Sequence, residues 1–337
     1  MPIQSHPPAI LLVKTSSLGD LIHNLPVVSD LFRQFPQTRI DWIAEESFAD
    51  IPSLHPAVHT VHTIALRRWK KQPLARQTRA EFLEFKKNLR HTLYDLTLDT
   101  QGLIKSAWIA RQANAPIAGY DWHSAREPLA CLAYQLRFSI PKQQHAVVRN
   151  RQLAAAAFGY SLENLPLDYG VQKSPFAAPW LPRDKPFIIF LTATSRDDKL
   201  WPLTHWRALG EKLTACGFNI LLPAGSAREQ ERAKKIAADI NTAKTTPSAG
   251  QAFPLPSLSI KELCALCGHA RAAVGVDTGL THLAGAVGIP TVALYTATEP
   301  GLTGVLGAGF FRNLGGAAVI PDIADVLAAL STARVLD

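Results

Sequence analysis

The sequence has 337 residues, and its 35 Lys and Arg against 27 Asp and Glu give a formal net charge of +8. At roughly 150 residues per domain this length predicts about two domains, while 47% hydrophobic and 18% charged residues exclude a disordered chain. No run approaches the ~18 consecutive apolar residues of a membrane-spanning helix. Four cysteines are too few for a disulfide framework in so long a chain, so we expect a reducing cytoplasmic compartment.

Short β-branched runs alternate with helical patterns along the first half of the chain. The continuous apolar run 9–13 is typical of a buried parallel strand and is too short for the core of a signal peptide. Further strands are predicted at 39–44, 59–64 and 95–98, with helices such as 21–35 and 80–93 between them.

A second alternating series follows, with strands predicted at 187–191, 218–222, 272–276 and 291–295 and helices at 203–215, 227–240 and 260–270. Strand–helix alternation that occurs twice indicates an α/β fold with two domains, each around a parallel sheet. Prolines 166, 175, 179 and 182 mark a linker, and spaced apolar residues predict a last helix over 321–335. We therefore expect domains at 1–170 and 171–320, followed by a C-terminal segment at 321–337.

The loops that follow the strands are the first place to look for chemistry, because open parallel sheets bind ligands beyond the carboxyl ends of their strands. Two facing sheets are expected to leave a cleft there. The first loop, 14–20, is small and polar, and Gly19 would let its backbone approach a ligand closely. It has neither a Walker nor a dinucleotide glycine pattern. Asp20 has two open interpretations, a carboxylate that begins the next helix or a general base.

Two loops in the second half suit a phosphate group. Thr194, Ser195 and Lys199 offer hydroxyls and a cation, although a salt-bridged surface turn is the alternative. After the strand 272–276, a helix start at 278–280 would present free N–H groups to a ligand. Asp277 is either the N-cap of that helix or a ligand-binding group, and His282 is interpreted first as a partly buried histidine.

The sequence shows no pattern typical of a metal site. Cys264 and Cys267 are interpreted as core residues, because no second cysteine pair accompanies them. No Asp-x-Asp occurs, which disfavours transferases that hold a sugar nucleotide through a metal.

A basic stretch between Arg67 and Arg90 carries nearly all of the net charge, with nine Lys and Arg against Glu81 and Glu84, or 9 − 2 = +7. It is either a solvated helix face or a binding surface for phosphates, nucleic acid or acidic lipids. Trp69 within it is an aromatic group that would stack on a base or contact a sugar or lipid.

Together these segments resemble the lipopolysaccharide heptosyltransferases of type I over nearly the whole chain. The resemblance rests on Lys14-Thr15-Ser16-Ser17-Leu18-Gly19-Asp20, Asp41-Trp42-Ile43-Ala44-Glu45-Glu46, Arg67-Arg68-Trp69, Asp99-Thr100-Gln101-Gly102, Ala125-Arg126-Glu127-Pro128, Thr194-Ser195-Arg196-Asp197-Asp198-Lys199 and Val276-Asp277-Thr278-Gly279-Leu280 with His282-Leu283. Where relatives often read Tyr-Gly-Pro-Thr-Asp-Pro, this chain reads Tyr295-Thr296-Ala297-Thr298-Glu299-Pro300.

The resemblance implies a GT-B fold, two Rossmann-like domains facing a cleft, with the C-terminal helix returning to the first domain. It implies inverting, metal-independent transfer of L-glycero-D-manno-heptose from ADP-heptose, a substrate rather than a cofactor, to the Kdo of Kdo–lipid A. The partners that follow are this donor, this acceptor and the inner membrane at its cytoplasmic face, with no nucleic acid and a monomeric chain.

The resemblance also assigns roles to individual residues. Asp20 and Lys199 are the expected catalytic residues, the base and the cation that offsets charge on the departing diphosphate. The expected donor-binding set is Thr194, Ser195, Lys199, Glu229 (ribose), Leu258 (adenine), Asp277 (heptose hydroxyls), Thr278, Gly279, Leu280 and His282. The expected acceptor-binding set is Ser17, Gly19, Arg67, Arg68, Lys70, Lys71, Gln101 and Arg126.

Two alternatives from other classes remain at this point. A sugar-nucleotide epimerase would share the cleft and need no macromolecular acceptor. A non-enzymatic nucleic-acid-binding protein would use the basic stretch and bind with strong salt dependence.

Overall fold

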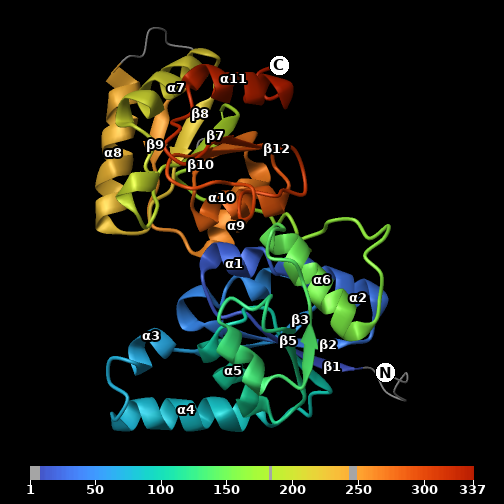
Figure 1. The fold of residues 1–337 in the computed structure, drawn as a ribbon. Helices are drawn as coiled ribbons and strands as arrows, with labels where there is room; N and C mark the ends of the chain where they lie inside the picture. Colours follow the sequence, from blue (N-terminus) through green and yellow to red (C-terminus); the bar gives the residue numbers. More distant parts are fainter. Residues whose placement is uncertain (1–7, 182–183, 243–248) are drawn as a thin grey trace. The chain divides into compact units, whose positions relative to one another are not determined.

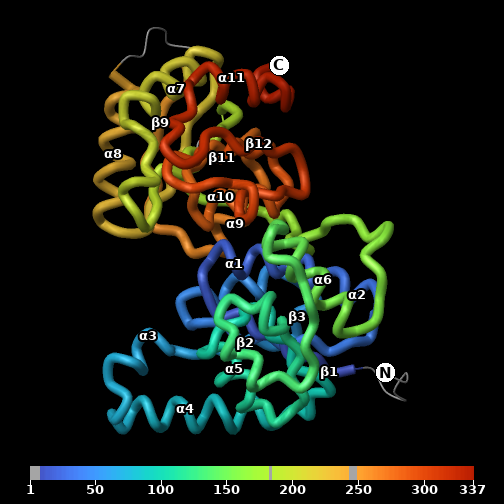
Figure 2. The backbone as a smooth tube through the Cα atoms, in the orientation of Figure 1, coloured from blue at the N-terminus to red at the C-terminus, as the bar shows by residue number. Residues whose placement is uncertain are grey.

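The computed structural model describes residues 8–181, 184–242 and 249–337. The N-terminal extension before Ala9, to which the sequence assigned no role, lies outside these residues except for Pro8. The chain divides into two compact units between Val171 and Gln172, within the proline-rich segment. Each unit is built around a six-stranded parallel sheet with helices on its faces (Figure 1). Figure 2 follows the first unit from blue to green and the second from green to red. In the described ranges no helix has the length and apolar character that a membrane crossing needs.

The first unit has its sheet in the order β3-β2-β1-β4-β5-β6. The strands are β1 (Ala9–Val13), β2 (Arg39–Glu45), β3 (Val58–Ile64), β4 (Leu96–Asp99), β5 (Ile117–Tyr120) and β6 (Leu136–Phe138). The α-helices are α1 (Leu18–Ile22), α2 (Leu25–Gln34), α3 (Leu66–Trp69), α4 (Arg76–Leu89), α5 (Ile104–Ala110) and α6 (Ala146–Phe158), with short 3₁₀ turns η1 (Glu46–Phe48), η2 (Pro52–Leu54), η3 (Arg111–Ala113) and η4 (Pro128–Ala133).

The helix predicted over 21–35 is two helices, α1 and α2. Pro26 occupies the first turn of α2, where its missing N–H costs nothing. The same proline could not sit inside a continuous helix, because it lacks the donor and its ring would clash with the preceding turn. The chain therefore breaks at His23 and Asn24, which leaves α1 as a short helix directly after the first loop.

The second unit repeats this topology with the order β12-β11-β10-β7-β8-β9. Its strands are β7 (Phe187–Leu191), β8 (Asn219–Leu222), β9 (Ala252–Pro254), β10 (Ala272–Val276), β11 (Thr291–Tyr295) and β12 (Phe311–Gly315). Its helices are η5 (Asp197–Lys199), α7 (Leu203–Ala215), α8 (Ala227–Thr242), α9 (Ile260–His269), α10 (Gly279–Val287) and α11 (Ile323–Thr332). Two parallel sheets with this strand order confirm the α/β fold class.

The apolar face of the C-terminal helix packs within the second unit. Val326, Ala329 and Leu330 of α11 are buried in the core of the second unit, and the helix packs against α7, β11 and β12. This core is centred on the fully buried Trp201 and Trp206, whose ring centroids lie 5.0 Å apart. The apolar face of α11 therefore closes the core of the second unit.

Candidate active site

In each sheet the order of the strands reverses at one point, between β1 and β4 in the first unit and between β7 and β10 in the second. At such a switch point the loops beyond the strand ends diverge and leave room for a ligand. The residues that follow these four strands are therefore the candidate site of each unit.

Gln101 ties together the two loops at the switch point of the first unit. Its side-chain oxygen accepts hydrogen bonds from the backbone N–H and the hydroxyl of Thr15, at 2.7 and 2.8 Å. Its amide nitrogen donates to the carbonyl of Ser16 at 3.3 Å. The buried Gln101 thus fixes the loop that carries the predicted Ser17, Gly19 and Asp20.

Asp20 is the third residue of α1 and lies half-buried. Its Oδ2 accepts hydrogen bonds from the N–H of Ser17 at 2.8 Å and from the Ser17 hydroxyl at 2.9 Å. This is the helix-start contact that the sequence left open. Among the described residues none donates a hydrogen bond to its Oδ1, so one carboxylate oxygen holds the loop and the other remains available for chemistry.

Lys14, at the end of β1, belongs to this site although the sequence analysis gave it no role. Burial lowers the pKa of Lys14, against the opposing effect of the carboxylates Asp20 and Asp99, and Arg126 adds a smaller lowering effect. Its ammonium group donates to the carbonyl of Thr100 at 2.9 Å. The signal in the sequence that could have pointed to Lys14 is its position directly after a buried strand. The exposed Arg126 thus acts electrostatically on the same cluster.

Asp99, at the end of β4, is a buried carboxylate next to this cluster. It is fully buried and accepts hydrogen bonds from the hydroxyls of Ser106 and Tyr134, both at 2.8 Å. Burial raises the pKa of Asp99 despite these hydrogen bonds. Its Oδ1 also accepts hydrogen bonds from the N–H groups of Gln101 and Gly102, so Asp99 fixes the loop after β4.

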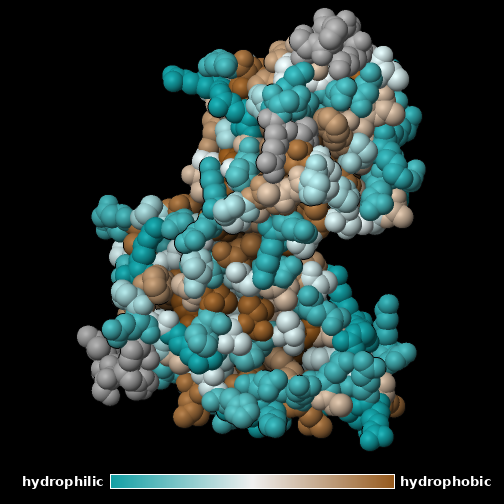
Figure 3. Space-filling view, turned by 180° about the vertical axis from the view of Figure 1, so that it is seen from behind, coloured by the Kyte–Doolittle hydropathy of each residue, from teal (hydrophilic) through white to brown (hydrophobic). Residues whose placement is uncertain are grey.

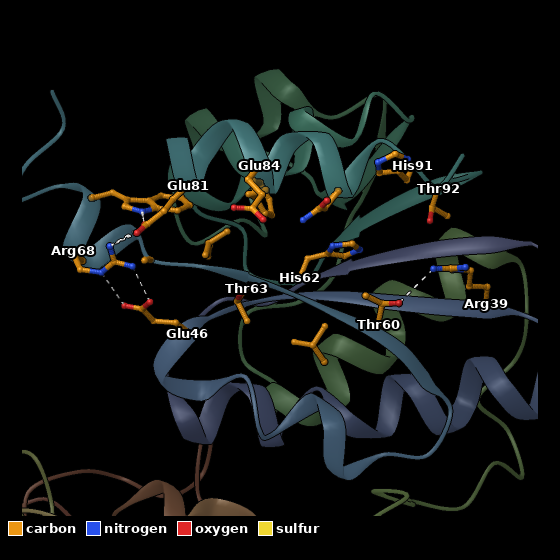
Figure 4. Close-up of a pocket in the computed structure, with 16 residues that line it drawn as sticks. Arg39, Glu46, Thr60, His62, Thr63, Arg68, Glu81, Glu84, His91 and Thr92 are labelled. Carbon is orange, nitrogen blue, oxygen red and sulfur yellow. Dashed lines mark hydrogen bonds and ion pairs between the residues drawn. The ribbon is translucent and has the colours of Figure 1, made fainter. Parts of the chain in front are cut away.

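The predicted cations in and just after α3 differ in their contacts. The buried Glu45 accepts hydrogen bonds from the backbone N–H groups of Leu66 and Arg67, at 3.2 and 2.9 Å, which fixes the start of α3. Arg68 is clamped between Glu46 at 3.1 Å and Glu81 at 2.8 Å (Figure 4). Arg67, Lys70 and Lys71 are exposed. The guanidinium of Arg67 lies over the Phe48 ring, 5.0 Å from its centroid.

Trp69 does not have the role that its sequence position suggested. It is buried, and its indole N–H donates to Glu81 at 2.7 Å. Its ring also packs edge-on against Phe82. The aromatic ring therefore anchors α3 to α4, and the small part that stays exposed lines the pocket beside β3.

A pocket of about 580 Å³ lies along the edge strand β3, beneath α4. Figure 4 shows Thr60 and His62 on β3 facing Glu84 and His91 across it. Arg68 is the one predicted site residue that lines this pocket. The loops at the switch points are separate from it.

Asp277 joins three loops of the second unit. Its Oδ2 accepts hydrogen bonds from the ammonium group of Lys199 at 2.6 Å and from the hydroxyl of Thr298 at 2.8 Å. Its backbone carbonyl accepts one from the hydroxyl of Thr194 at 2.9 Å. The N-cap of α10 is Thr278, so the alternative role of Asp277 as that cap is wrong. Thr298 was not predicted, and only its place in the altered 295–300 segment pointed to it.

The start of α10 presents backbone donors beside this network. The N–H groups of Thr278, Gly279 and Leu280 precede the first helical hydrogen bond, so the helix itself does not use them. The buried His282 places its Nε2 4.0 Å from Oδ1 of Asp277. Ser195 is exposed in the loop after β7. Lysine, hydroxyls and a helix start in one place form the kind of site that binds a diphosphate.

Glu229 and Leu258 lie on other elements of the second unit. Oε2 of Glu229 accepts hydrogen bonds from the N–H groups of Gly225 at 2.8 Å and Ser226 at 3.1 Å, while the Ser226 hydroxyl accepts one from the Glu229 N–H at 3.3 Å. Glu229 is thus a capping residue at the start of α8. Leu258 is half-buried just before α9.

The cysteines and acidic residues form no metal centre in the part of the chain that the structure describes, since no group of three or more His, Cys, Asp and Glu is arranged to hold a metal ion there. Cys264 and Cys267 are buried on α9, and burial raises their pKa to about 11 and about 12. Their interpretation as core residues is confirmed.

Comparison with known proteins gives a consistent result. Residues 82–312 match the model of glycosyltransferase family 9 (heptosyltransferase). Lipopolysaccharide heptosyltransferase 1 of Pseudomonas aeruginosa is 43% identical over 299 residues, 88% of this chain and 81% of that protein. Its counterpart from Escherichia coli K12 is 41% identical over 300 residues, 88% of this chain and 91% of that protein.

A solved structure agrees with these relatives. The E. coli heptosyltransferase WaaC with ADP superposes with a TM-score of 0.85 at 37% identity, covering 96% of this chain and 99% of that one. The resemblance to type I lipopolysaccharide heptosyltransferases and the GT-B fold are thereby confirmed, and the protein is a glycosyltransferase. The chain belongs to glycosyltransferase family 9, the heptosyltransferases.

Proposed function

We propose that this protein transfers L-glycero-D-manno-heptose from ADP-heptose to the Kdo residue of Kdo–lipid A, with inversion and without a metal ion. The relatives named above support the reaction class. The observation that carries the proposal is the network around Asp277, where Lys199, Thr194 and the start of α10 meet. The missing Asp-x-Asp fits a donor site that neutralises the diphosphate with protein groups.

The donor binds to the second unit in this proposal. Lys199, Thr194, Ser195 and the N–H groups at 278–280 stabilise the negative charge that grows on the departing ADP. Asp277 and His282 orient the heptose, and Thr298 holds the Asp277 carboxylate in place. Glu229 contacts the ribose through the oxygen that capping leaves free, and Leu258 packs against adenine.

The acceptor binds to the first unit. The free oxygen of Asp20 takes the proton from a Kdo hydroxyl. The oxygen of that Kdo hydroxyl bonds to the anomeric carbon of heptose while the bond from this carbon to ADP breaks. Ser17, Gly19, Gln101 and Arg126 shape this site. Arg67, Lys70 and Lys71 attract the phosphates and carboxylates of the acceptor, with Arg68 held beside them by its two glutamates.

The acceptor is a membrane lipid, so the proposed setting is peripheral contact of a monomer with the cytoplasmic face of the inner membrane. The chain is a glycosyltransferase by family. The test below also distinguishes transfer from the two alternatives, an epimerase and a nucleic-acid-binding protein without enzymatic activity. ADP release is measured with ADP-heptose in the presence and absence of Kdo–lipid A. Release that depends on acceptor supports the proposal, whereas acceptor-independent turnover of ADP-heptose or no turnover would contradict it.

A further inference from the structure

The outer face of α4 is a basic stripe with an exposed leucine at its centre. Phe85 and Leu89 pack inward and are buried. On the opposite side, Arg76, Arg79, Leu83 and Lys87 recur at the three- and four-residue spacing that places side chains on one face of a helix. Leu83 is 64% exposed. An apolar side chain thus projects to solvent between cations on both sides along the helix.

Two more exposed apolar groups lie near this stripe. Trp108 of α5 is 46% exposed and stacks on Phe82 of α4, with ring centroids 5.2 Å apart. Leu74, in the loop before α4, is 77% exposed. In Figure 3 hydrophobic residues protrude among hydrophilic ones along the lower edge of the first unit, the edge at which Figure 1 places α4.

The charges of this stripe are not balanced by acidic neighbours. Among the residues that the structure describes, Arg76, Arg79, Lys86 and Lys87 form no ion pair, whereas Arg68 nearby forms two. The other long charged helix, α8, differs, because three of its cations have acidic partners: Arg228 with Asp197, Lys234 with Glu231 and Lys235 with Asp239. Glu81 and Glu84 lie on the same helix, but in the described residues neither pairs with these four cations, so a ligand would have to supply their counter-charges.

We propose that the α4 face, defined as Leu74, Arg76, Arg79, Leu83, Lys86, Lys87 and Trp108, docks on a bilayer that contains anionic lipids. Leu74, Leu83 and Trp108 enter the headgroup region, and the cations contact lipid phosphates. A helix with Lys and Arg around exposed Leu and Trp is the pattern that lies in a membrane interface. Apolar groups that project between the cations favour a lipid surface over nucleic acid, which would leave them in water. The proposal deepens the peripheral contact suggested above and rests on it only for its biological setting.

The test measures co-sedimentation of the full chain with vesicles of phosphatidylcholine alone or in equal parts with phosphatidylglycerol, with no donor or acceptor present. We expect binding to the anionic vesicles only, weakened by salt. Lys86→Gln with Lys87→Gln should weaken it on the order of tenfold or more, and Leu83→Ser should weaken it as well. The matched control, Lys234→Gln with Lys235→Gln on α8, should bind as the wild type does.

Fluorescence gives a second measurement that does not depend on loss of binding. The difference between wild type and Trp108→Phe isolates the emission of Trp108, which should shift to shorter wavelength on anionic vesicles. Four results would each overturn the proposal. The wild type does not bind vesicles, or the α8 control loses as much vesicle binding as the α4 variant does. Alternatively, the emission of Trp108 does not shift when the protein is bound to vesicles, or the protein binds duplex DNA more tightly than vesicles. ADP binding by every variant verifies its fold. Because no sugar transfer is measured, failure here is distinct from failure of the transfer assay.

Discussion

Lys199 and Asp277 are joined by an ion pair of 2.6 Å between Nζ and Oδ2, although 78 residues separate them in the sequence. Lys199 follows β7 and Asp277 follows β10, and these two strands are neighbours in the sheet. Both side chains are largely buried, at 18% and 16% exposure. The ion pair thus places both charged groups of the proposed donor site side by side. In the proposed reaction Lys199 serves the diphosphate and Asp277 serves the sugar.

Replacing Lys199 by Ala should impair use of ADP-heptose more than use of the acceptor. The variant removes the cation that pairs with Asp277 and leaves the Thr298 hydroxyl as the described donor to Oδ2 of Asp277. Steady-state kinetics with each substrate varied in turn measure the effect. Lys235→Ala is the control, because Lys235 is exposed and pairs with Asp239 at 3.6 Å. An unchanged donor KM and kcat in Lys199→Ala would remove the residue from the donor site.

Replacing Asp20 by Ala should abolish transfer while ADP binding persists. Loss of a positioned base costs about 10²–10⁴-fold in rate. The same variant also loses the contact to Ser17, and loss of a helix cap costs about 1 kcal/mol. Ser17→Ala separates the two roles, since it removes the hydroxyl and keeps the carboxylate. If Ser17→Ala lowers the rate as far as Asp20→Ala does, the carboxylate acts only by holding the helix.

The cations at the start of the basic stretch, residues 67–71, should serve the acceptor and not the nucleotide. Neutralising Arg67, Lys70 and Lys71 together should raise the KM for Kdo–lipid A and flatten its salt dependence, because several exposed charges act jointly and are screened by salt. The Kd for ADP-heptose, from isothermal titration, should barely move. A fall in donor affinity with unchanged acceptor kinetics would assign these cations to the nucleotide.

Arg68 needs a separate variant, because it also holds α3 to Glu46 and Glu81. Adding Arg68→Gln to the triple variant should raise the acceptor KM further. Glu81→Gln provides the comparison, since it loosens the same clamp without removing a cation. Equal effects of Arg68→Gln and Glu81→Gln, each made alone, would show that Arg68 acts through the position of α3.

Stability of the first unit should fall as the pH drops from 6.5 toward 4. Burial lowers the pKa of His55 from 6.5 to about 4. Its Nδ1 accepts a hydrogen bond from the Ala57 N–H at 3.1 Å, and its Nε2 lies 2.9 Å from the Ser29 hydroxyl, so the neutral ring is the form that fits. Between the two values the unfolded chain holds a proton that the folded chain lacks. The contribution is complete above 6.5 and is lost as pH falls toward 4, on the order of 3 kcal/mol in all.

Denaturant unfolding across this pH range tests the assignment. His55→Gln should flatten the dependence of the free energy of unfolding on pH, because it removes the group that titrates. His91→Gln is the control, since His91 is exposed. A pH dependence that survives in His55→Gln would place the titrating group elsewhere.

The sequence by itself determined the α/β class and the strands at the centre of each sheet. The predicted bounds of β1, β7, β10 and β11 agree with the structure residue for residue. These strands are covered on both faces, so every position is apolar or small and the run stands out from its surroundings. The edge strands β6, β9 and β12 have exposed or half-buried residues, and three to five residues of mixed character carry no such signal.

Only the tertiary structure decided how the candidate site residues are combined. Gln101 reaches Thr15 across 86 residues, and Thr298 reaches Asp277 across 21, because the order of strands in the sheet makes the loops neighbours. The burial of Trp69, the clamp on Arg68 and the packing of α11 were equally outside the reach of local pattern. Spacing along the chain predicts which face a side chain takes on its own element, but partners are set by which elements pack together.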